Sequence, residues 1–94
     1  MFVVRNTFTA KPGMAGKLAA QMKETGTLMK LSNLRVMTDF ASGFNTVVME
    51  HEAKSLADLE ASFKEYGSNA EVKEKMKGYT DLWTEGRREI FQLV

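Results

Sequence analysis

The fold is decided by the stretch from Asn33 to Ala53, which reads NLRVMTDFASGFNTVVMEHEA. On both sides of the turn at Ser42 to Asn45 the side chains alternate between two faces, with the period of two that is typical of β-strands. The pattern predicts one strand from Asn33 to Phe40 and another from Asn45 to Ala53. Only a short turn connects them, so we expect an antiparallel hairpin, since a parallel return needs a dozen or more residues.

The segment before this hairpin predicts a strand followed by a helix. Residues Phe2 to Ala10 alternate in the same way, and Pro12 with Gly13 ends the strand, because proline lacks the ladder N–H and glycine relaxes the backbone for a turn. The helix that follows carries a stripe of side chains three or four positions apart, which is expected to face the core. The stripe consists of Met14, Leu18, Met22, Thr25 and Met29.

The segment after the hairpin predicts two short helices and a last strand. Ser55, with Asp58 three residues later, is a helix-start signal, and the stripe that follows it is Leu56, Leu59, Phe63 and Tyr66. Gly67 can end that helix, and Ser68 with Glu71 forms a capping box for a second one. Alternation returns from Arg87 to Val94 and predicts the fourth strand.

These elements predict one α+β domain over residues 1–94 with the order β-α-β-β-α-β, a ferredoxin-like, four-stranded antiparallel sheet with helices on one face. The opposite face is expected to be too polar for a closed core and too apolar to be left wet. It would carry Val3, Arg5, Thr7, Arg35, Met37, Asp39, Val48, Glu50 and Ile90. We therefore expect a homodimer through this sheet face, with Arg5, Arg35 and Arg88 offsetting the acids. The alternative is a monomer whose sheet is wet on one side.

Composition narrows the class of protein. Of the 94 residues 44% are hydrophobic and 27% charged, which is typical of a globular chain, and neither disorder nor a membrane span is favoured. The net charge is +1 with the two signs interspersed, so nucleic-acid binding gets no support. The chain has no cysteine, which excludes disulfides and thiolate chemistry. Its first residues follow a strand pattern, so we do not expect a secretory leader. A cytoplasmic location is expected.

The pattern resembles the dimeric α/β-barrel superfamily and, within it, the antibiotic-biosynthesis-monooxygenase-like domains, over nearly the whole chain. The resemblance is carried by the first strand running into Thr9-Ala10-Lys11-Pro12-Gly13, and by Val47 to Ala53 ending in Lys54-Ser55-Leu56 at a helix start. It implies two ferredoxin-like sheets packed face to face into a barrel. It also implies a pocket in each subunit between its own sheet and helices.

The group includes haem-degrading monooxygenases, in which an asparagine on the first strand, a tryptophan ending the third and a histidine in the second helical region surround the ligand. Asn6 is similar to the first of these. Ala53 stands at the tryptophan position, and no histidine occurs from Lys54 to Tyr79. The resemblance therefore disfavours haem degradation, and no cofactor is expected.

Two residues are candidates for catalysis. Asn6 lies among apolar residues on the helix-facing side of its strand, where an unpaired amide costs about 1–3 kcal/mol, so it either orients a substrate oxygen or bonds to backbone or water. His51, the only histidine, is in register with Val47 and Met49 and is either a general base or a structural residue. One histidine with scattered carboxylates lacks the ligand cluster of a metal site. Substrate contacts are expected from Phe8, Thr38, Phe40, Tyr79 and Trp83.

The sequence leaves two functions open. One is a monooxygenase-like oxidoreductase that acts on a small apolar or aromatic molecule without a cofactor, with Asn6 polarising the substrate and His51 as base. The other is a ligand-binding or structural homodimer without catalysis.

Overall fold

The structure, a computed structural model, describes residues 1–94 throughout. Four strands, three α-helices and one 3₁₀ turn follow each other along the chain. They are β1 (Phe2–Ala10), α1 (Ala15–Leu28), β2 (Ser32–Thr38), β3 (Thr46–Ala53), α2 (Leu56–Ser68), α3 (Ala70–Lys75), η1 (Tyr79–Leu82) and β4 (Trp83–Gln92). None of the helices combines the length and the apolar character that a membrane crossing requires.

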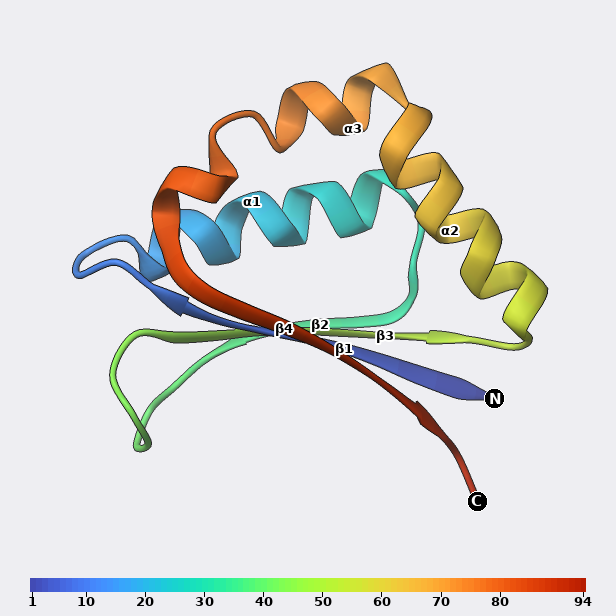
Figure 1. The fold of residues 1–94 in the computed structure, drawn as a ribbon, viewed down its shortest axis with the longest axis horizontal. Helices are drawn as coiled ribbons and strands as arrows, with labels where there is room; N and C mark the ends of the chain where they lie inside the picture. Colours follow the sequence, from blue (N-terminus) through green and yellow to red (C-terminus); the bar gives the residue numbers. More distant parts are fainter.

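The four strands form one antiparallel sheet in the order β2-β3-β1-β4, so β1 and β3 are central and β2 and β4 are edges. All helices lie on one face of the sheet, and the other face is open (Figure 1). This arrangement confirms the predicted α+β, ferredoxin-like fold.

The hairpin between β2 and β3 is wider than the sequence predicts. The carboxylate of Asp39 accepts a hydrogen bond from the backbone N–H of Thr46 at 2.9 Å, and Asn45 adopts a left-handed φ of 61°. The side chain therefore closes the loop, and β2 ends at Thr38 instead of Phe40. Phe40 consequently belongs to the loop and is 105% exposed.

The break between α2 and α3 falls one residue later than predicted. Ser68 is the last residue of α2, and its hydroxyl donates to the carbonyl of Lys64 at 2.8 Å. Asn69 caps α3 instead, because its Oδ1 accepts from the backbone N–H groups of Glu71 at 2.9 Å and Val72 at 3.2 Å. Asn69 lies outside both helices, so its side chain is free to accept these two bonds. Ser68 cannot replace it, because its hydroxyl is already bonded to a carbonyl one turn earlier in α2.

The register of β4 corrects the predicted distribution of its side chains. Asn6 pairs with Arg88 and Val4 with Ile90, so Arg88 and Ile90 share the helix-covered face with Asn6 and Val4. The prediction that they belong to the open face is wrong. The strand also begins earlier than expected, at Trp83, because β1 pairs with it as far as Ala10.

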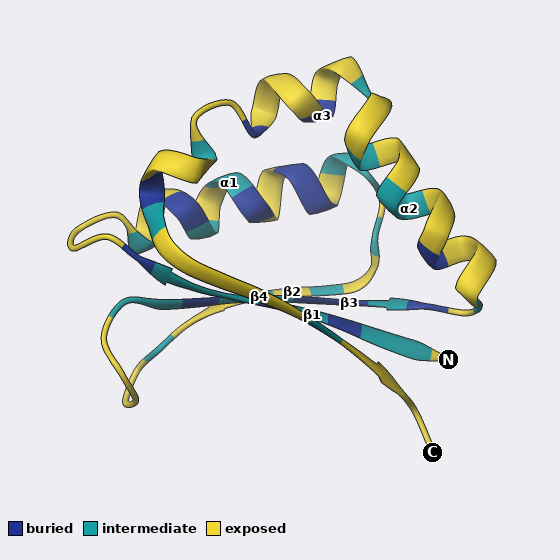
Figure 2. Ribbon diagram, viewed as in Figure 1, coloured by how far each residue is buried: buried dark blue, intermediate teal, exposed yellow.

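The core between sheet and helices is divided into two parts. One cluster gathers under α1 and η1 and contains Ala10, Leu18, Met22, Val47 and Leu82. The other lies under α2 and contains Val4, Ala53 and Leu59. Only 15 of the 94 residues are buried, and Figure 2 shows that they concentrate on the central strands and on the inner side of the helices. Two of the buried residues are polar side chains from the middle of β1 and the end of β3, Asn6 and His51.

Candidate functional site

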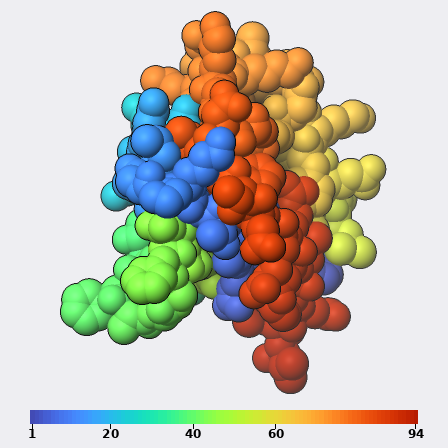
Figure 3. All heavy atoms as spheres, turned by 60° about the vertical axis from the view of Figure 1, so that its left-hand side comes forward, coloured from blue at the N-terminus to red at the C-terminus, as the bar shows by residue number.

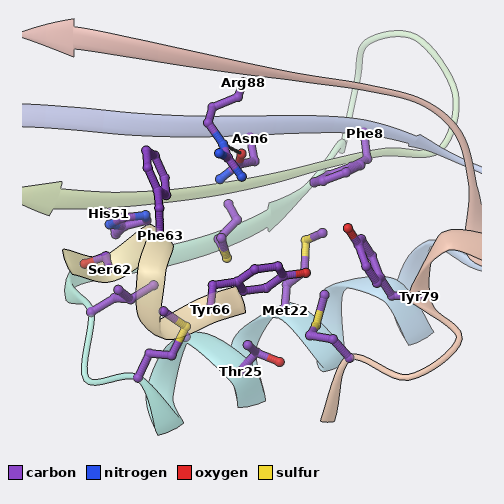
Figure 4. A pocket seen from close by; sticks show the side chains of 15 residues that line it. Asn6, Phe8, Met22, Thr25, His51, Ser62, Phe63, Tyr66, Tyr79 and Arg88 are labelled. Atoms are coloured by element: carbon purple, nitrogen blue, oxygen red, sulfur yellow. Dashed lines mark hydrogen bonds between the residues drawn. The ribbon is translucent and has the colours of Figure 1, made fainter. Parts of the chain in front are cut away.

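A cavity of about 80 Å³ opens between the sheet and the helices. Its walls are mainly methionine and aromatic side chains, and seven polar side chains face it: Asn6, Thr25, His51, Ser62, Tyr66, Tyr79 and Arg88. In Figure 4 Asn6 and Arg88 come from the sheet side and Thr25 from α1, while His51 lies at one end and Phe8 and Tyr79 at the other. The chain contains no group of three or more histidine or acidic side chains that could hold a metal ion.

Asn6 is held by a side chain that the sequence places 82 residues away. The Nε of Arg88 donates a hydrogen bond to its Oδ1 at 2.9 Å, and the guanidinium lies over the ring of Phe63 at 4.5 Å from the ring centre. The carbonyl end of the amide is therefore occupied, and no protein group accepts from its NH₂ end. The buried amide is thus oriented with a free donor on the cavity wall.

His51 is 5% exposed, and its Nδ1 is buried without a hydrogen-bond partner. Burial, followed by the positive charge of Arg88, lowers the pKa of His51 below its ordinary 6.5. The imidazole is therefore neutral at pH 7 and able to accept a proton.

A β-bulge lies directly opposite His51. Ser32 pairs with Glu52 and Arg35 with Glu50, so two residues of β2, Asn33 and Leu34, face this single residue of β3. Asn33 adopts a left-handed φ of 50°, which asparagine tolerates better than most residues. Bulges of this kind are over-represented next to functional sites, where they redirect a side chain. Nothing in the alternation of β2 marks the bulge in advance.

Four further polar side chains at the cavity were not among the predicted site residues: Thr25, Ser62, Tyr66 and Arg88. Thr25 is buried, and its hydroxyl has no hydrogen-bond partner. One signal in the sequence points to it, because Thr25 is a polar residue in a helix stripe of methionine and leucine. Burial, and then a hydrogen bond with Tyr79, raises the pKa of Tyr66, so the phenol stays protonated. Arg88 could not be found in advance, because its place on the helix-facing side follows from the β1–β4 register alone.

The structure brings together four of the seven predicted site residues. Asn6, His51, Phe8 and Tyr79 all line the cavity. Trp83 packs edge-on against Phe8 with ring centres 5.1 Å apart, so it supports the cavity wall without lining it.

The other two predicted contacts lie outside the cavity. Thr38 is exposed at the end of an edge strand, and Phe40 points from the hairpin loop into solvent. Phe40 was predicted on a strand that continues to Phe40, and the early end of β2 moves it into the loop. Thr38 stays in β2 opposite Val47, but it is the last residue of this edge strand and lies beyond the cavity.

The open face of the sheet carries an ion-pair cluster made of Arg5, Glu50 and Arg35. The Nε of Arg5 donates to Glu50 at 2.6 Å, and Arg35 donates to the other carboxylate oxygen. The two guanidinium groups cover Glu50, which is buried although it lies on the uncovered side of the sheet. Hydrogen bonds from Arg5 and then from Arg35 hold the pKa of Glu50 below its ordinary 4.5.

This cluster predicts a pH-dependent contribution to stability. Because the pKa of Glu50 is lower in the folded state, its contribution is complete above pH 4.5 and is lost as the pH falls through the lowered value. We expect Glu50→Gln to lose about 1 kcal/mol of unfolding free energy at pH 7, since both arginines are more than a third exposed. Urea unfolding at pH 7, 5 and 3 measures this. If parent and variant lose stability equally below pH 4.5, the cluster contributes nothing.

The element order and the sheet topology together define a ferredoxin-like α+β fold. A scan against known protein families finds no match, and no curated protein matches the chain.

Several solved structures share this fold over nearly the whole chain. An uncharacterised NIPSNAP domain protein from Burkholderia xenovorans superposes with a TM-score of 0.83 at 12% identity, covering 100% of this chain and 95% of that one. A NIPSNAP family protein of unknown function from Agrobacterium tumefaciens gives 0.82 at 17%, covering 97% and 86%. A candidate antibiotic biosynthesis monooxygenase from Nitrosomonas europaea gives 0.77 at 12%, covering 100% and 99%. At these identities the likeness shows the fold. The same fold therefore occurs in a candidate antibiotic biosynthesis monooxygenase and in NIPSNAP proteins, and the sequence did not suggest the second group.

Proposed function

We propose that this protein is a monooxygenase-like oxidoreductase that acts, without a cofactor, on a small and largely apolar carbon acid in the cavity. The observation that carries the proposal is the convergence of two groups on one apolar space. Asn6 presents a free amide donor that Arg88 holds in place, and His51 is a buried neutral imidazole with an unpartnered nitrogen.

The chemistry follows from these two groups. His51 accepts a proton from an activated C–H bond, and the electron pair moves onto the substrate oxygen, where the Asn6 NH₂ stabilises the resulting anion. Dioxygen, the second substrate, takes up the electron pair to form a C–O bond. The proton on His51 then goes to the peroxide, giving a hydroperoxide. Loss of water turns a CH₂ group into a carbonyl, so one CH₂ and one O₂ give one C=O and one H₂O.

The proposal includes a homodimer through the open sheet face. That face combines the ion-pair cluster with apolar side chains, among them Val48, Met37 and Phe91. In Figure 1 the β2–β3 hairpin and the C-terminal end of β4 both bend away from the helices towards this side, and Figure 3 shows them projecting below the helical layer. A second copy suits a surface that carries both signs of charge, because a two-fold axis can bring the arginines of one copy opposite the acidic side chains of the other. We place the dimer in the cytoplasm, which the lack of cysteine supports.

Nitroethane in D₂O tests the base and the amide, because it is compact, its C–H ionises slowly, and its anion places charge on oxygen. The protein is expected to accelerate the loss of the methylene proton signal in the NMR spectrum. We expect His51→Gln and Asn6→Ala each to lower the catalysed rate about 100-fold, which is the usual effect of removing a general base or an anion-stabilising donor. A dioxygen electrode in the same samples separates oxygenation from proton transfer alone.

Thr38→Ala is the matched control, because Thr38 was a predicted contact that lies outside the cavity, and its rate should equal that of the parent. No acceleration by the parent, or equal rates in all variants, would overturn the proposed catalysis. Nitroethane that perturbs cavity resonances without faster exchange would favour the ligand-binding alternative.

A further inference from the structure

The permanent charge at the cavity is of one sign only, and it is positive. Among the residues that line it, Arg88 is the one with a permanent charge, and there is no aspartate or glutamate. The remaining polar groups are an amide, two phenols, two hydroxyls and a neutral imidazole. A cavity with an unopposed cation attracts ligands with negative charge.

Arg88 is held in place without being neutralised. One of its five N–H donors is used on Asn6, and its guanidinium is stacked over Phe63, but no carboxylate pairs with it. The residue is exposed to solvent on its outer side and lines the cavity on its inner side, so it stands at the mouth. Figure 4 shows it reaching from β4 past β1 to Asn6, beside Phe63. The terminal NH₂ groups are thus fixed and free for a planar two-oxygen anion.

The size of the cavity limits the apolar part of a ligand whose anionic group binds at Arg88. A volume of about 80 Å³ is smaller than the roughly 150 Å³ of an engineered cavity that encloses benzene. A branched or short aliphatic group therefore fits, whereas an aromatic ring needs the flexible methionines Met22, Met49 and Met76 to move.

We propose that the ligand of this cavity is a small carboxylic acid in its ionised form, with Arg88 at the mouth binding the carboxylate and the apolar walls enclosing a short tail that carries the activated C–H bond. The inference names the substrate class of the site described under the proposed function and therefore rests on the same cavity. Arg88 is accordingly the residue that determines selectivity for an anion, and Asn6 positions its guanidinium.

Arg87 offers a matched control for Arg88. It is the neighbouring residue on the same strand and carries the same charge. Its Nε lies 3.5 Å from the carboxylate of Glu89, and the alternation of β4 places it on the open face. Arg87→Gln and Arg88→Gln therefore change the net charge equally, on opposite sides of the sheet.

The experiment compares isobutyrate with isobutyramide, which have nearly the same shape and differ in charge, by NMR titration at pH 7.5. The parent is expected to bind isobutyrate with shifts at Asn6, Phe63 and the Nε–H of Arg88, and to bind isobutyramide at least tenfold more weakly. Arg88→Gln should weaken isobutyrate binding roughly ten- to hundredfold, the range for hydrogen bonds to a charged group, while Arg87→Gln binds like the parent. Arg88→Lys should lie between them, because it keeps the charge and loses the planar fork. Thermal melts of each variant establish that it is folded.

Each result decides the matter. Equal binding of acid and amide, or an Arg88→Gln variant that binds isobutyrate like the parent, overturns the anion site while leaving the cavity as a ligand site. No binding of either compound overturns this inference together with the proposed cavity. If isobutyrate binds through Arg88 but the protein does not accelerate proton exchange of nitroethane, the anion site is supported and the proposed catalysis is overturned.

Discussion

Replacing Val48 with aspartate is expected to convert the proposed dimer into monomers. Val48 lies on central strand β3, paired on one side with Thr7 and on the other with Met37, so it stands in the middle of the open face. In a dimer the new carboxylate would be buried without a partner at the centre of the interface. We expect the dissociation constant to rise about 100-fold or more, which corresponds to roughly 3 kcal/mol. Sedimentation velocity over a range of protein concentrations measures this change.

The control for this variant is Ala61→Asp, which adds the same charge on the exposed side of α2. It should associate like the parent, because helix α2 covers the other face of the sheet. The dimer is refuted if the parent sediments as a monomer at tens of micromolar, or if Val48→Asp leaves a parent dimer intact.

The second large effect is expected from Leu18→Ala. Leu18 belongs to α1 and is 0% exposed. It lies in the larger core cluster together with Val47 of β3. Truncating a buried leucine removes its transfer free energy and leaves a void, which together cost about 2–5 kcal/mol. In a domain with so few buried residues this is a large part of the total stability. Urea unfolding monitored by circular dichroism should show a lower midpoint.

Leu56→Ala is the comparison for that measurement. Leu56 is also a helical leucine, in the first turn of α2, but it is 63% exposed. Its replacement should change the unfolding free energy by about 0.5 kcal/mol or less. Equal losses in the two variants would mean that the core does not lie where the structure places it.

The divided core explains why this protein has a cavity between its sheet and its helices. Asn6, His51 and Thr25 occupy buried positions where apolar side chains would join the two clusters. Two of the three have a polar atom without any partner, which costs about 1–3 kcal/mol each. A sequence that keeps such groups inside is typical of a functional site, because a stability optimum would fill the space.

Several features of this protein could be predicted from the sequence because their causes are local. The period of two around Asn45 predicts the hairpin, and the stripe through Leu18 and Met22 predicts the buried face of α1. The same alternation places Asn6 and Phe8 on one side of β1, and His51 with Met49 on one side of β3. Periodicity needs no knowledge of neighbouring strands, so the element order and half of the candidate site follow from it.

Only the tertiary structure decides which of these faces meet and what lies between them. The pairing of Asn6 with Arg88 joins residues 82 positions apart, and it turns a presumed surface arginine into the charged group of the cavity. The bulge opposite His51 and the early end of β2 depend on pairing between strands in the same way. Register is a property of two strands at once and shifts every side chain when it slips by one residue, so no pattern within a single strand contains it.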